Sequence, residues 1–546
     1  MPLQQEHPLN CYAFLMPREP LEQWAHAPCD LLVIGGGATG LGVAVQAALE
    51  GRRVALVEAR DFASGTSSRS TKLLHGGVRY LAQGRLKLVW QALRERATVL
   101  QLAPHLAQPL SFVVAETSWL SWGVTAFGLK LYAWMAGGLS LGRTQMVSAR
   151  AMQHVLPSLV YRWPGVRYWD GQFDDARLAV TLANTAVQAG ARVRNHTRVS
   201  ALTQTADGWC AELHDEITGQ TAHIQAACVV NAAGVWVDRL RSLALGEGVA
   251  PGRAVQPLVQ PSQGVHLVVD RATLPLTEAV LVPRTSDGRV LFAVPWLGAT
   301  VIGTTDTPRQ DAPLEPEPTA QELAFLLQET RRCLGLDLQP EQIRSVWVGL
   351  RPLVSPAGPG AGRTSALSRE HLIAREAPGF WTVTGGKWTT YRSMAAEVLQ
   401  GVVGQGDLPS PARQVDTRTH RLWGAPESNT LMPTPDLKGP PGPHLLGSQA
   451  GCLSALPGQH THLGLGLTEA MVRYCARHEW AITVEDMLAR RWRVLFLDSR
   501  LAQAIAPRVA EILQQETGLD PELTAFLGLC QRYRLPSESP PACASA

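Results

Sequence analysis

The stretch DLLVIGGGATGLGVAVQAALEGRRVALVEAR, residues 30–60, decides the fold. An apolar run at residues 31–34 ends in a glycine-rich turn, an alanine-rich helix follows, and a second apolar run at residues 54–57 ends in Glu58. This order predicts a strand, a tight turn, a helix and a second strand, the βαβ unit that binds dinucleotides in doubly wound α/β folds.

Three glycines and one glutamate have distinct chemical roles in such a unit. Gly35 permits the turn, Gly37 lets a pyrophosphate approach the backbone, and Gly40 lets the helix pack against the sheet. The phosphates would lie at the positive helix N-terminus, and Glu58, eighteen positions past Gly40, would accept the ribose hydroxyls. A glycine-rich crossover without a ligand leaves Glu58 at the strand tip unexplained, so we expect dinucleotide binding.

The composition places limits on the class of protein. The chain has 546 residues, of which 45% are hydrophobic, enough for two or three domains of an ordinary soluble or peripherally attached protein. A net charge of +3 is too small to indicate a nucleic-acid partner. Nine cysteines occur without a C-x-x-C pair or metal-like spacing, so we expect no metal site, no disulfide framework and a reducing compartment. No secretory signal is evident at the N-terminus.

A second irregular segment, GTSSRSTKLLHGGVRY at residues 65–80, follows the βαβ unit. Hydroxyls, small residues and three cations are packed around a Gly-Gly pair. Such a loop suits hydrogen bonds from backbone and side chains to a polar ligand, whereas the plainer interpretation is a solvated basic loop.

Two more strands end in small residues. An apolar strand at residues 227–231 stops at Ala232-Ala233-Gly234, and a strand at residues 380–384 is followed by GGKWTTY, residues 385–391, and a helix. A strand, a glycine pair and a helix N-terminus can hold an anion or a developing negative charge. Turns of this kind so far apart in the sequence predict one long cofactor bound across a discontinuous domain.

Residues 253–306 have the pattern of an antiparallel sheet that would cover the cofactor. Short apolar runs alternate with turn signals, and the first run contains Gln263-Gly264-Val265-His266. A later strand, residues 346–350, ends in Arg351-Pro352, where the proline fixes the backbone just past an arginine.

Residues 119–141, WLSWGVTAFGLKLYAWMAGGLSL, form the most apolar segment of the chain. Their length is close to that of a membrane span, but Lys130 lies at the middle and Gly128, Gly137 and Gly138 weaken the helix. We expect a buried helix pair here, with a surface that rests on a bilayer through its Trp and Tyr residues as the alternative.

Taken together, these motifs resemble the FAD-dependent glycerol-3-phosphate dehydrogenases of bacterial and mitochondrial respiration, over nearly the whole chain. The long motif TSSRSTKLLHGGVRYL at residues 66–81 is very specific for that family. The other matching motifs are IGGGATG with Glu58, DGQFDDARL at 170–178, GVHLVV at 264–269, IGTTD at 302–306, GLRPL at 349–353, GGKWTTYR at 385–392, and RHEWA and DMLARR at 477–481 and 486–491.

The resemblance implies an α/β fold in three parts. We expect a discontinuous Rossmann-like FAD-binding domain, an inserted and mainly antiparallel β substrate domain, and a linker followed by a C-terminal helical domain. The expected ranges are 28–110, 171–245 and 350–405 for the first, 111–170 and 246–349 for the second, and 406–546 for the third.

The resemblance also implies a reaction and a location. The substrate would be sn-glycerol 3-phosphate, oxidised to dihydroxyacetone phosphate with reduction of FAD, and the electrons would pass to a membrane quinone. The protein would be cytoplasmic and peripherally associated with the lipid surface of the cytoplasmic membrane, and a homodimer is compatible with the sequence.

Oxidation of a secondary alcohol needs a hydride acceptor and a base for the hydroxyl proton. His266 is the expected base, since its pKa lies near working pH, although a lone histidine is often structural. Arg351 would polarise the reacting oxygen, Arg79 and Tyr80 would help to hold the substrate, and its phosphate would contact Arg79, Arg351 or Lys387. Lys387, beside the glycine pair, could instead touch the flavin.

The expected FAD contacts come from all the motifs above. They are Gly35, Gly37, Gly40, Glu58, Thr66, Ser67, Ser68, Lys72, Leu73, His75, Gly77, Val199, Ala232, Gly234, Gly385, Gly386, Lys387 and Thr389.

Two departures from the family and several alternatives stay open. Many relatives carry lysine where this chain has Gln263, and often leucine where it has Trp388, so affinity or turnover would fall if that lysine contacts a ligand. No motif separates a quinone acceptor from oxygen. A 2-hydroxy-acid or amine oxidase of the same superfamily, or a non-enzymatic flavin-binding module, would share the fold.

Overall fold

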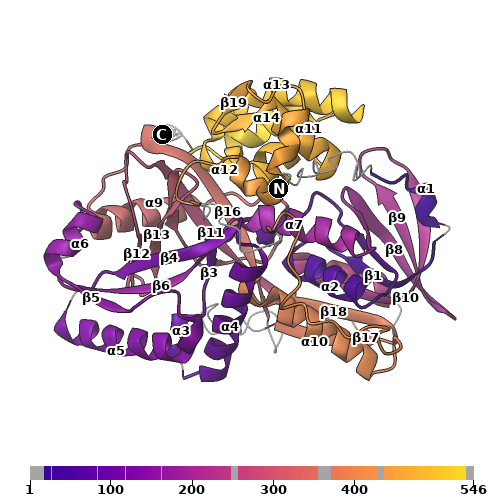
Figure 1. The fold of residues 1–546 in the computed structure, drawn as a ribbon, viewed down its shortest axis with the longest axis horizontal. Coiled ribbons are helices and arrows are strands. Elements are labelled where there is room, and N and C mark those ends of the chain that lie inside the picture. Colours follow the sequence, from indigo (N-terminus) through magenta and orange to yellow (C-terminus); the bar gives the residue numbers. More distant parts are fainter. Residues whose placement is uncertain are drawn as a thin grey trace, which may run out of the picture.

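The computed structural model describes residues 18–536, except 26, 83, 117, 161–162, 247–255, 355–370 and 427–435. Within these residues, a mainly parallel sheet flanked by helices lies beside a second, mixed sheet, and a helical C-terminal region packs across both (Figure 1). The predicted fold class is confirmed. Residues 1–17 lie outside the described residues.

The βαβ unit forms as its apolar pattern predicts. Residues 31–33 of its first strand are fully buried. Helix α2 (Ala38–Leu49) connects its two strands. Five parallel strands make the centre of the first sheet, in the order β7 (Arg192–Arg194), β2 (Val54–Val57), β1 (Cys29–Ile34), β10 (Thr221–Asn231) and β18 (Phe380–Gly385). Because these strands run in one direction, the turns after β1, β10 and β18 meet at the same edge.

Other elements extend and cover this sheet. Strands β8 (Thr197–Thr205), β9 (Gly208–Asp215) and β17 (His371–Ala377) continue it in antiparallel fashion. The helices that accompany it are α1 (Glu22–Ala25), α7 (Asp175–Gln188), α8 (Val237–Leu245) and α10 (Tyr391–Gly404). Helix α2 packs against both α7 and α10, which buries its alanine-rich faces.

The second sheet has ten strands and is mainly antiparallel. Its described strands are β3 (Leu73–Leu74), β4 (Ala107–Val114), β5 (Gln145–Val147), β6 (Gly165–Phe173), β11 (Val259–Asp270), β12 (Ala279–Val282), β13 (Leu291–Trp296), β14 (Ala299–Gly303), β15 (Thr307–Pro308) and β16 (Ile343–Val354). Strand β11 pairs with β14 and β16, so His266 lies between Gly303 and Trp347. Strands β4, β6 and β16 run through the expected boundaries at residues 110, 170 and 350, so the sheet crosses three of the expected domain boundaries.

Helices α3 (Val78–Ala82), α4 (Leu86–Leu102), α5 (Trp119–Ala136), α6 (Ala149–Val155) and α9 (Ala320–Glu329) accompany the second sheet. The expectation of a buried helix pair at residues 119–141 is wrong. Segment 119–136 is one helix, α5, and it is apolar on its outer side as well as its inner side. No helix in the described part of the chain is long and apolar enough to cross a membrane.

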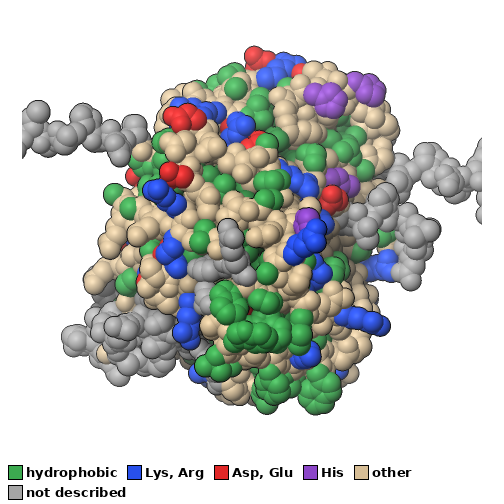
Figure 2. Space-filling view, turned by 90° about the vertical axis from the view of Figure 1, so that its left-hand side faces the viewer, with side chains coloured by type: hydrophobic (Ala, Val, Ile, Leu, Met, Phe, Trp, Pro, Cys, Tyr) green, Lys and Arg blue, Asp and Glu red, His purple; other side chains and the backbone are tan. Residues whose placement is uncertain are grey.

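The outer side of α5 carries large exposed apolar side chains. They are Trp119, Leu120, Val124, Phe127 and Trp134, with exposed fractions of 69%, 81%, 67%, 72% and 78%. We call these five residues the apolar stripe. Figure 2 shows hydrophobic side chains gathered at the lower end of the face where α5 lies in Figure 1, with Lys and Arg side chains around them. An exposed apolar surface of this kind marks an interaction site.

The C-terminal region contains α11 (Glu469–His478), α12 (Val494–Leu497), α13 (Ser499–Thr517) and α14 (Leu523–Arg532). Its inner face shares one hydrophobic core with the first sheet. Buried ion pairs also join the two regions, including Arg177 of α7 with Glu479. The C-terminal region is therefore an integral part of the fold.

Candidate active site

A cavity of about 850 Å³ lies where the turns of the first sheet face the second sheet. Its volume is in the range of ligand pockets, about 300–1,000 Å³. Most of the sequence-predicted site residues line it: Gly35, Gly37, Glu58, Thr66, Ser67, Leu73, His75, Val199, Ala232, Gly234, His266, Arg351, Gly385, Gly386, Lys387 and Thr389. The fold thus brings together residues from six of the matching motifs, whereas those at 170–178, 477–481 and 486–491 do not line the cavity.

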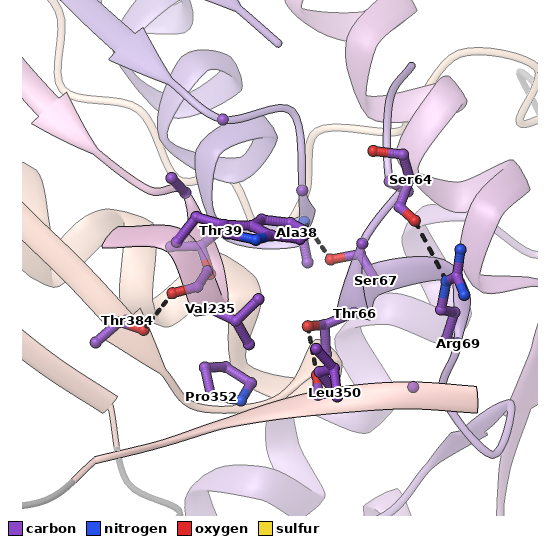
Figure 3. Close-up of a pocket in the computed structure, with 18 of the residues that line it drawn as sticks. Ala38, Thr39, Ser64, Thr66, Ser67, Arg69, Val235, Leu350, Pro352 and Thr384 are labelled. Atoms are coloured by element: carbon purple, nitrogen blue, oxygen red, sulfur yellow. Dashed lines mark hydrogen bonds between the residues drawn. The ribbon is translucent and has the colours of Figure 1, made fainter. Parts of the chain in front are cut away.

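The turn after β1 has the close backbone contacts that the glycine pattern predicts. Gly35 has φ +116°, and a Cβ there would lie 2.6 Å from the Ala232 carbonyl oxygen. A Cβ on Gly40 would lie 1.9 Å from the Gly35 oxygen, so Gly40 packs the helix against the turn and does not line the cavity. Ser67 Oγ accepts from Ala38 N at 3.0 Å, which joins the second loop to the first turn of α2 (Figure 3).

The Glu58 carboxylate is fixed at the cavity wall by two backbone groups. Its Oε2 accepts from Gly36 N at 2.7 Å and its Oε1 from Arg60 N at 2.9 Å. Each oxygen keeps a second lone pair, so both can still accept from a hydroxyl. This arrangement, with the glycine turn and the α2 N-terminus, fits the ribose and pyrophosphate of a dinucleotide such as FAD.

His266 lies on the roof of the cavity and is almost fully buried. Its ring stacks on Trp347 with centroids 4.0 Å apart, and its Nε2 lies 3.1 Å from Thr71 Oγ1. Its Nδ1 has no hydrogen-bond partner among the described residues. Burial, together with the Arg351 and Lys72 charges, holds the pKa of His266 well below its usual range. The imidazole is therefore neutral at neutral pH, as a general base must be, but burial places its pKa below the working range, whereas the expectation from the sequence is a pKa near working pH.

Two glycines let the reacting groups approach the sheet. A Cβ on Gly303 would lie 2.5 Å from His266 Cδ2, and one on Gly264 would lie 2.4 Å from Arg351 Nη2. Sequence reasoning did not select Gly303, Gly264 or Thr71 as site residues, although all three lie inside the motifs that carried the resemblance. Their roles depend on contacts between separate strands, which a motif does not display.

Arg351 is held on the roof of the cavity by neutral and charged partners. Its Nη2 donates to the Thr305 carbonyl at 3.1 Å and to Thr304 Oγ1 at 3.2 Å. Its Nη1 also donates to a carboxylate oxygen of Asp306 at 3.4 Å, and a quarter of the side chain stays exposed at the cavity wall. From this position its positive charge can act on an anion or a developing negative charge in the cavity.

Lys387 also faces the cavity, and Tyr80 holds it from behind. The Lys387 Nζ lies 4.0 Å from the centroid of the Tyr80 ring. Tyr80 and Gly77 do not line the cavity, and a Cβ on Gly77 would collide with Tyr80 at 2.5 Å. These two residues support Lys387, whereas the side chain of Arg79 lies outside the described part of the structure.

Lys72 and Ser68 do not line the cavity, contrary to the expectation of FAD contacts. The Lys72 Nζ donates to Asp175 at 2.8 Å and to the Ser68 carbonyl at 2.6 Å. Burial and the nearby Arg493 lower the pKa of Lys72. Lys72 therefore fixes the loop from beneath, because an acidic partner inside the protein attracts it away from the cavity.

Gln263, the departure from the family, also faces away from the cavity. Its Nε2 donates to Glu322 Oε2 at 2.7 Å, and its Oε1 accepts from Arg309 at 2.8 Å. Trp388, the other departure, lines the cavity and donates its Nε1–H to the Ser67 carbonyl at 2.8 Å. The Gln263 side chain does not line the cavity, so the structure gives no reason to expect that this departure weakens ligand binding.

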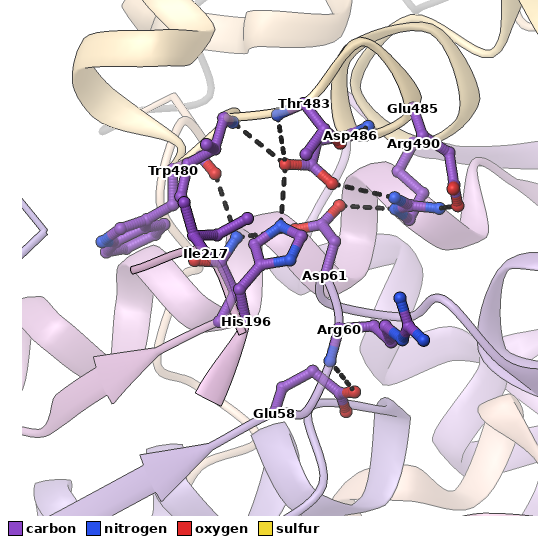
Figure 4. A network of polar contacts seen from close by, with 12 residues as sticks. Glu58, Arg60, Asp61, His196, Ile217, Trp480, Thr483, Glu485, Asp486 and Arg490 are labelled. Carbon is purple, nitrogen blue, oxygen red and sulfur yellow. Dashed lines mark hydrogen bonds and ion pairs between the residues drawn. The ribbon is translucent and has the colours of Figure 1, made fainter. Parts of the chain in front are cut away.

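A buried polar network joins the cavity side of the first sheet to the C-terminal region (Figure 4). Asp61, His196 and Asp486 place ligand atoms within 4.8 Å of one another, a spacing that could suit a metal ion. Arg490 and Arg491 already donate to Asp61, and His196 Nε2 lies 3.0 Å from Asp486 Oδ2. Since the carboxylates have cationic partners, the network is a structural ion-pair cluster.

Comparison with known proteins agrees with this site. A family model described as FAD dependent oxidoreductase matches residues 30–395, and one described as the C-terminal domain of alpha-glycerophosphate oxidase matches residues 449–524. The chain is 39% identical to the mitochondrial glycerol-3-phosphate dehydrogenase of Arabidopsis thaliana, over 90% of this chain and 83% of that protein. It is 35% identical to the mitochondrial enzyme of Homo sapiens, over 90% and 71% of the two chains.

A solved structure is similar over the same extent. The glycerol-3-phosphate dehydrogenase from Bacillus halodurans, complexed with FAD, has a TM-score of 0.73 and 27% sequence identity. The similarity covers 95% of this chain and 97% of that one. The predicted FAD cofactor is confirmed by the matching family.

Proposed function

Because the chain belongs to the family of FAD-dependent glycerol-3-phosphate dehydrogenases, we propose that it oxidises sn-glycerol 3-phosphate to dihydroxyacetone phosphate and passes the electrons to a membrane quinone. FAD, when bound, supplies the acceptor for the hydride that leaves the alcohol carbon. The observation that carries the proposal is the convergence of His266, Arg351 and Lys387 on one cavity, from β11, β16 and the turn after β18.

Each of these residues has one chemical task. The neutral His266 accepts the hydroxyl proton while the hydride leaves, so the carbon–oxygen single bond becomes a carbonyl. Arg351 directs its charge at the oxygen, where negative charge develops as the proton departs. Lys387 adds a second cation that pairs with the phosphate, and Tyr80 keeps its Nζ in place.

The apolar stripe of α5 supports a membrane acceptor. Large aromatic and aliphatic side chains on the outside of a helix bind the boundary between headgroups and acyl chains, without crossing the bilayer. A quinone dissolved in the same bilayer would then reach the enzyme from the lipid side. Membrane attachment and the quinone acceptor are parts of one proposal.

The half-reaction can be tested separately from the acceptor. Anaerobic addition of sn-glycerol 3-phosphate to the purified flavoprotein should bleach the flavin, whereas glycerol and 2-hydroxy acids should not. Bleaching by a 2-hydroxy acid or an amine, without bleaching by glycerol 3-phosphate, would reject the proposed substrate.

A second acceptor has one observation in its favour. Residues 449–524 match the C-terminal domain model of an oxidase, which uses oxygen in place of a quinone. An oxygen electrode distinguishes the two acceptors. The quinone proposal predicts slow oxygen uptake, and it predicts that a soluble quinone analogue is reduced in preference to oxygen. Rapid uptake with formation of peroxide would favour the oxidase.

A further inference from the structure

A second, open hollow lies on the molecule, away from the candidate active site. It has a volume of about 540 Å³ and is formed by the end of α5 and the turn that follows it. We call it the α5 hollow; its lining residues are Lys130, Ala133, Trp134, Ser140, Gly142, Arg143 and Thr144. Two cations and one aromatic side chain thus surround a space large enough for a small polar group.

The charges of the α5 hollow are uncompensated within the described structure. Neither Lys130 nor Arg143 forms an ion pair with a described carboxylate, and both side chains are exposed. No Asp or Glu occurs between Glu116 and Asp170, whereas five Lys and Arg residues do. The hydroxyls of Ser140 and Thr144 donate to backbone carbonyls. The hollow therefore favours an anion, which the two cations would hold.

The α5 hollow lies on the side of α5 that carries the apolar stripe. Lys130 is three positions after Phe127 and four before Trp134, so the three side chains lie on one face of the helix. Trp134, which is 78% exposed, belongs both to the stripe and to the hollow. A cation among apolar groups on a lipid-facing surface is costly unless it meets an anion at the level of the headgroups.

We propose that the α5 hollow binds the phosphate of an anionic phospholipid, with Lys130 and Arg143 as its two cationic contacts and Trp134 at headgroup level. This inference rests on the proposed membrane contact of α5. It adds a lipid preference to that contact, because an apolar stripe alone does not distinguish zwitterionic from anionic lipid. The site would fix which part of the helix lies at the phosphate level.

Vesicle co-sedimentation of the full-length holoenzyme tests the proposal, with phosphatidylcholine vesicles and with vesicles that also contain phosphatidylglycerol. The double variant K130Q/R143Q should bind phosphatidylcholine vesicles like the wild type. The ratio of its affinity for vesicles with phosphatidylglycerol to its affinity for phosphatidylcholine vesicles should fall about 10- to 30-fold. The matched control K87Q/R94Q removes two exposed cations of α4, which lie outside the hollow, and should lose much less. Oxidation of substrate with a soluble dye should be unchanged in both.

Two outcomes would overturn the lipid site. One is an equal loss of preference in K130Q/R143Q and K87Q/R94Q, which would mean diffuse attraction without a site. The other is a thermal shift by inorganic phosphate, in the absence of vesicles, that K130Q/R143Q abolishes, because the hollow would then take free phosphate. The variant F127S/W134S tests the underlying contact separately: if it binds phosphatidylcholine like the wild type, the proposed membrane contact itself fails.

Discussion

Arg491 and Arg351 are the same residue type in two regions that use it differently. Arg491, in the C-terminal region, is fully buried and donates to both oxygens of Asp61, as well as to the Glu479 carbonyl. Arg351, at the cavity, keeps a quarter of its side chain exposed, and its contacts include the Thr305 carbonyl at 3.1 Å and Asp306 at 3.4 Å. A fully paired buried arginine stabilises the fold, whereas a partly solvated one keeps its charge available for chemistry.

The same difference separates two buried histidines, His196 and His266. His196 lies against the Asp486 carboxylate, and although burial alone lowers its pKa, that carboxylate raises it. His266 faces a hydroxyl and two cations, and its pKa is lowered. The partner therefore decides whether a histidine acts as a structural cation or a neutral base.

The largest effect should come from removal of a buried structural charge. Arg491→Met leaves Asp61 without one of its two arginines, and loss of one partner of a buried pair costs about 3–5 kcal/mol of unfolding free energy. The exposed pair Arg53–Asp30 is the control, since Arg53→Gln should cost less than about 1 kcal/mol. Chemical denaturation measures both. Equal destabilisation by the two variants would contradict the structural role assigned to the buried arginine Arg491.

Removal of the cavity cation should affect activity more than stability. Arg351→Gln should lower kcat about 10²- to 10³-fold, the effect of losing one donor to a developing oxyanion. Arg309→Gln is the matched control, because Arg309 contacts Gln263 of β11, the strand beside β16, but pairs with Asp311 outside the cavity. Steady-state kinetics with a soluble dye gives both values. A large loss in the Arg309 variant as well would indicate general distortion of β11 and β16.

The His196–Asp486 pair should make stability depend on pH. Since the folded-state pKa of His196 is raised, its contribution is fully present below the ordinary value of 6.5 and is lost as pH rises through the raised pKa. The unfolding free energies of the wild type and His196→Gln, measured by chemical denaturation over a series of pH values, should therefore converge as pH rises through the raised pKa, by about 1.4 kcal/mol for each unit by which that pKa is raised. A difference that is constant with pH would mean that the pKa of His196 is the same in the folded and the unfolded chain.

The smallest effect should come from restoring the family residue. Gln263→Lys should leave kcat/KM within about twofold, because a side chain that makes no contact with the reacting groups does not alter the barrier. Its side chain points to Glu322 and Arg309. A gain of tenfold or more in kcat/KM would show that this position reaches the substrate after all.

The first sheet and most of the cavity wall could be predicted from sequence, because their determinants are local. The turn at Gly35 and the acidic strand end at Glu58 are readable from spacing, and the structure has them where the βαβ pattern requires. The side chains of Lys72 and Gln263 could not be placed, because their directions depend on Asp175 and Glu322, which other elements supply.

The outer side of α5 was also beyond sequence reasoning. The helix is apolar on every side, so hydrophobic periodicity does not identify which side is exposed. Leu129 and Tyr132 are buried, while Phe127 and Trp134 are not. Only the packing of the helix against the second sheet separates the two faces.

The most direct test of the account is the rate of anaerobic flavin reduction by sn-glycerol 3-phosphate, measured with ordinary and with C2-deuterated substrate. The flavin of the wild type should bleach rapidly with ordinary substrate, and more slowly with the deuterated substrate because the C2–H bond is broken in the measured step. His266→Asn should retain FAD and bleach about 10²- to 10⁴-fold more slowly, the contribution of a positioned base. If the His266→Asn enzyme bleaches at the wild-type rate with FAD bound, His266 is not the base. In that case, the distinction between the neutral histidine of the cavity and the paired histidine of the C-terminal interface has no catalytic meaning.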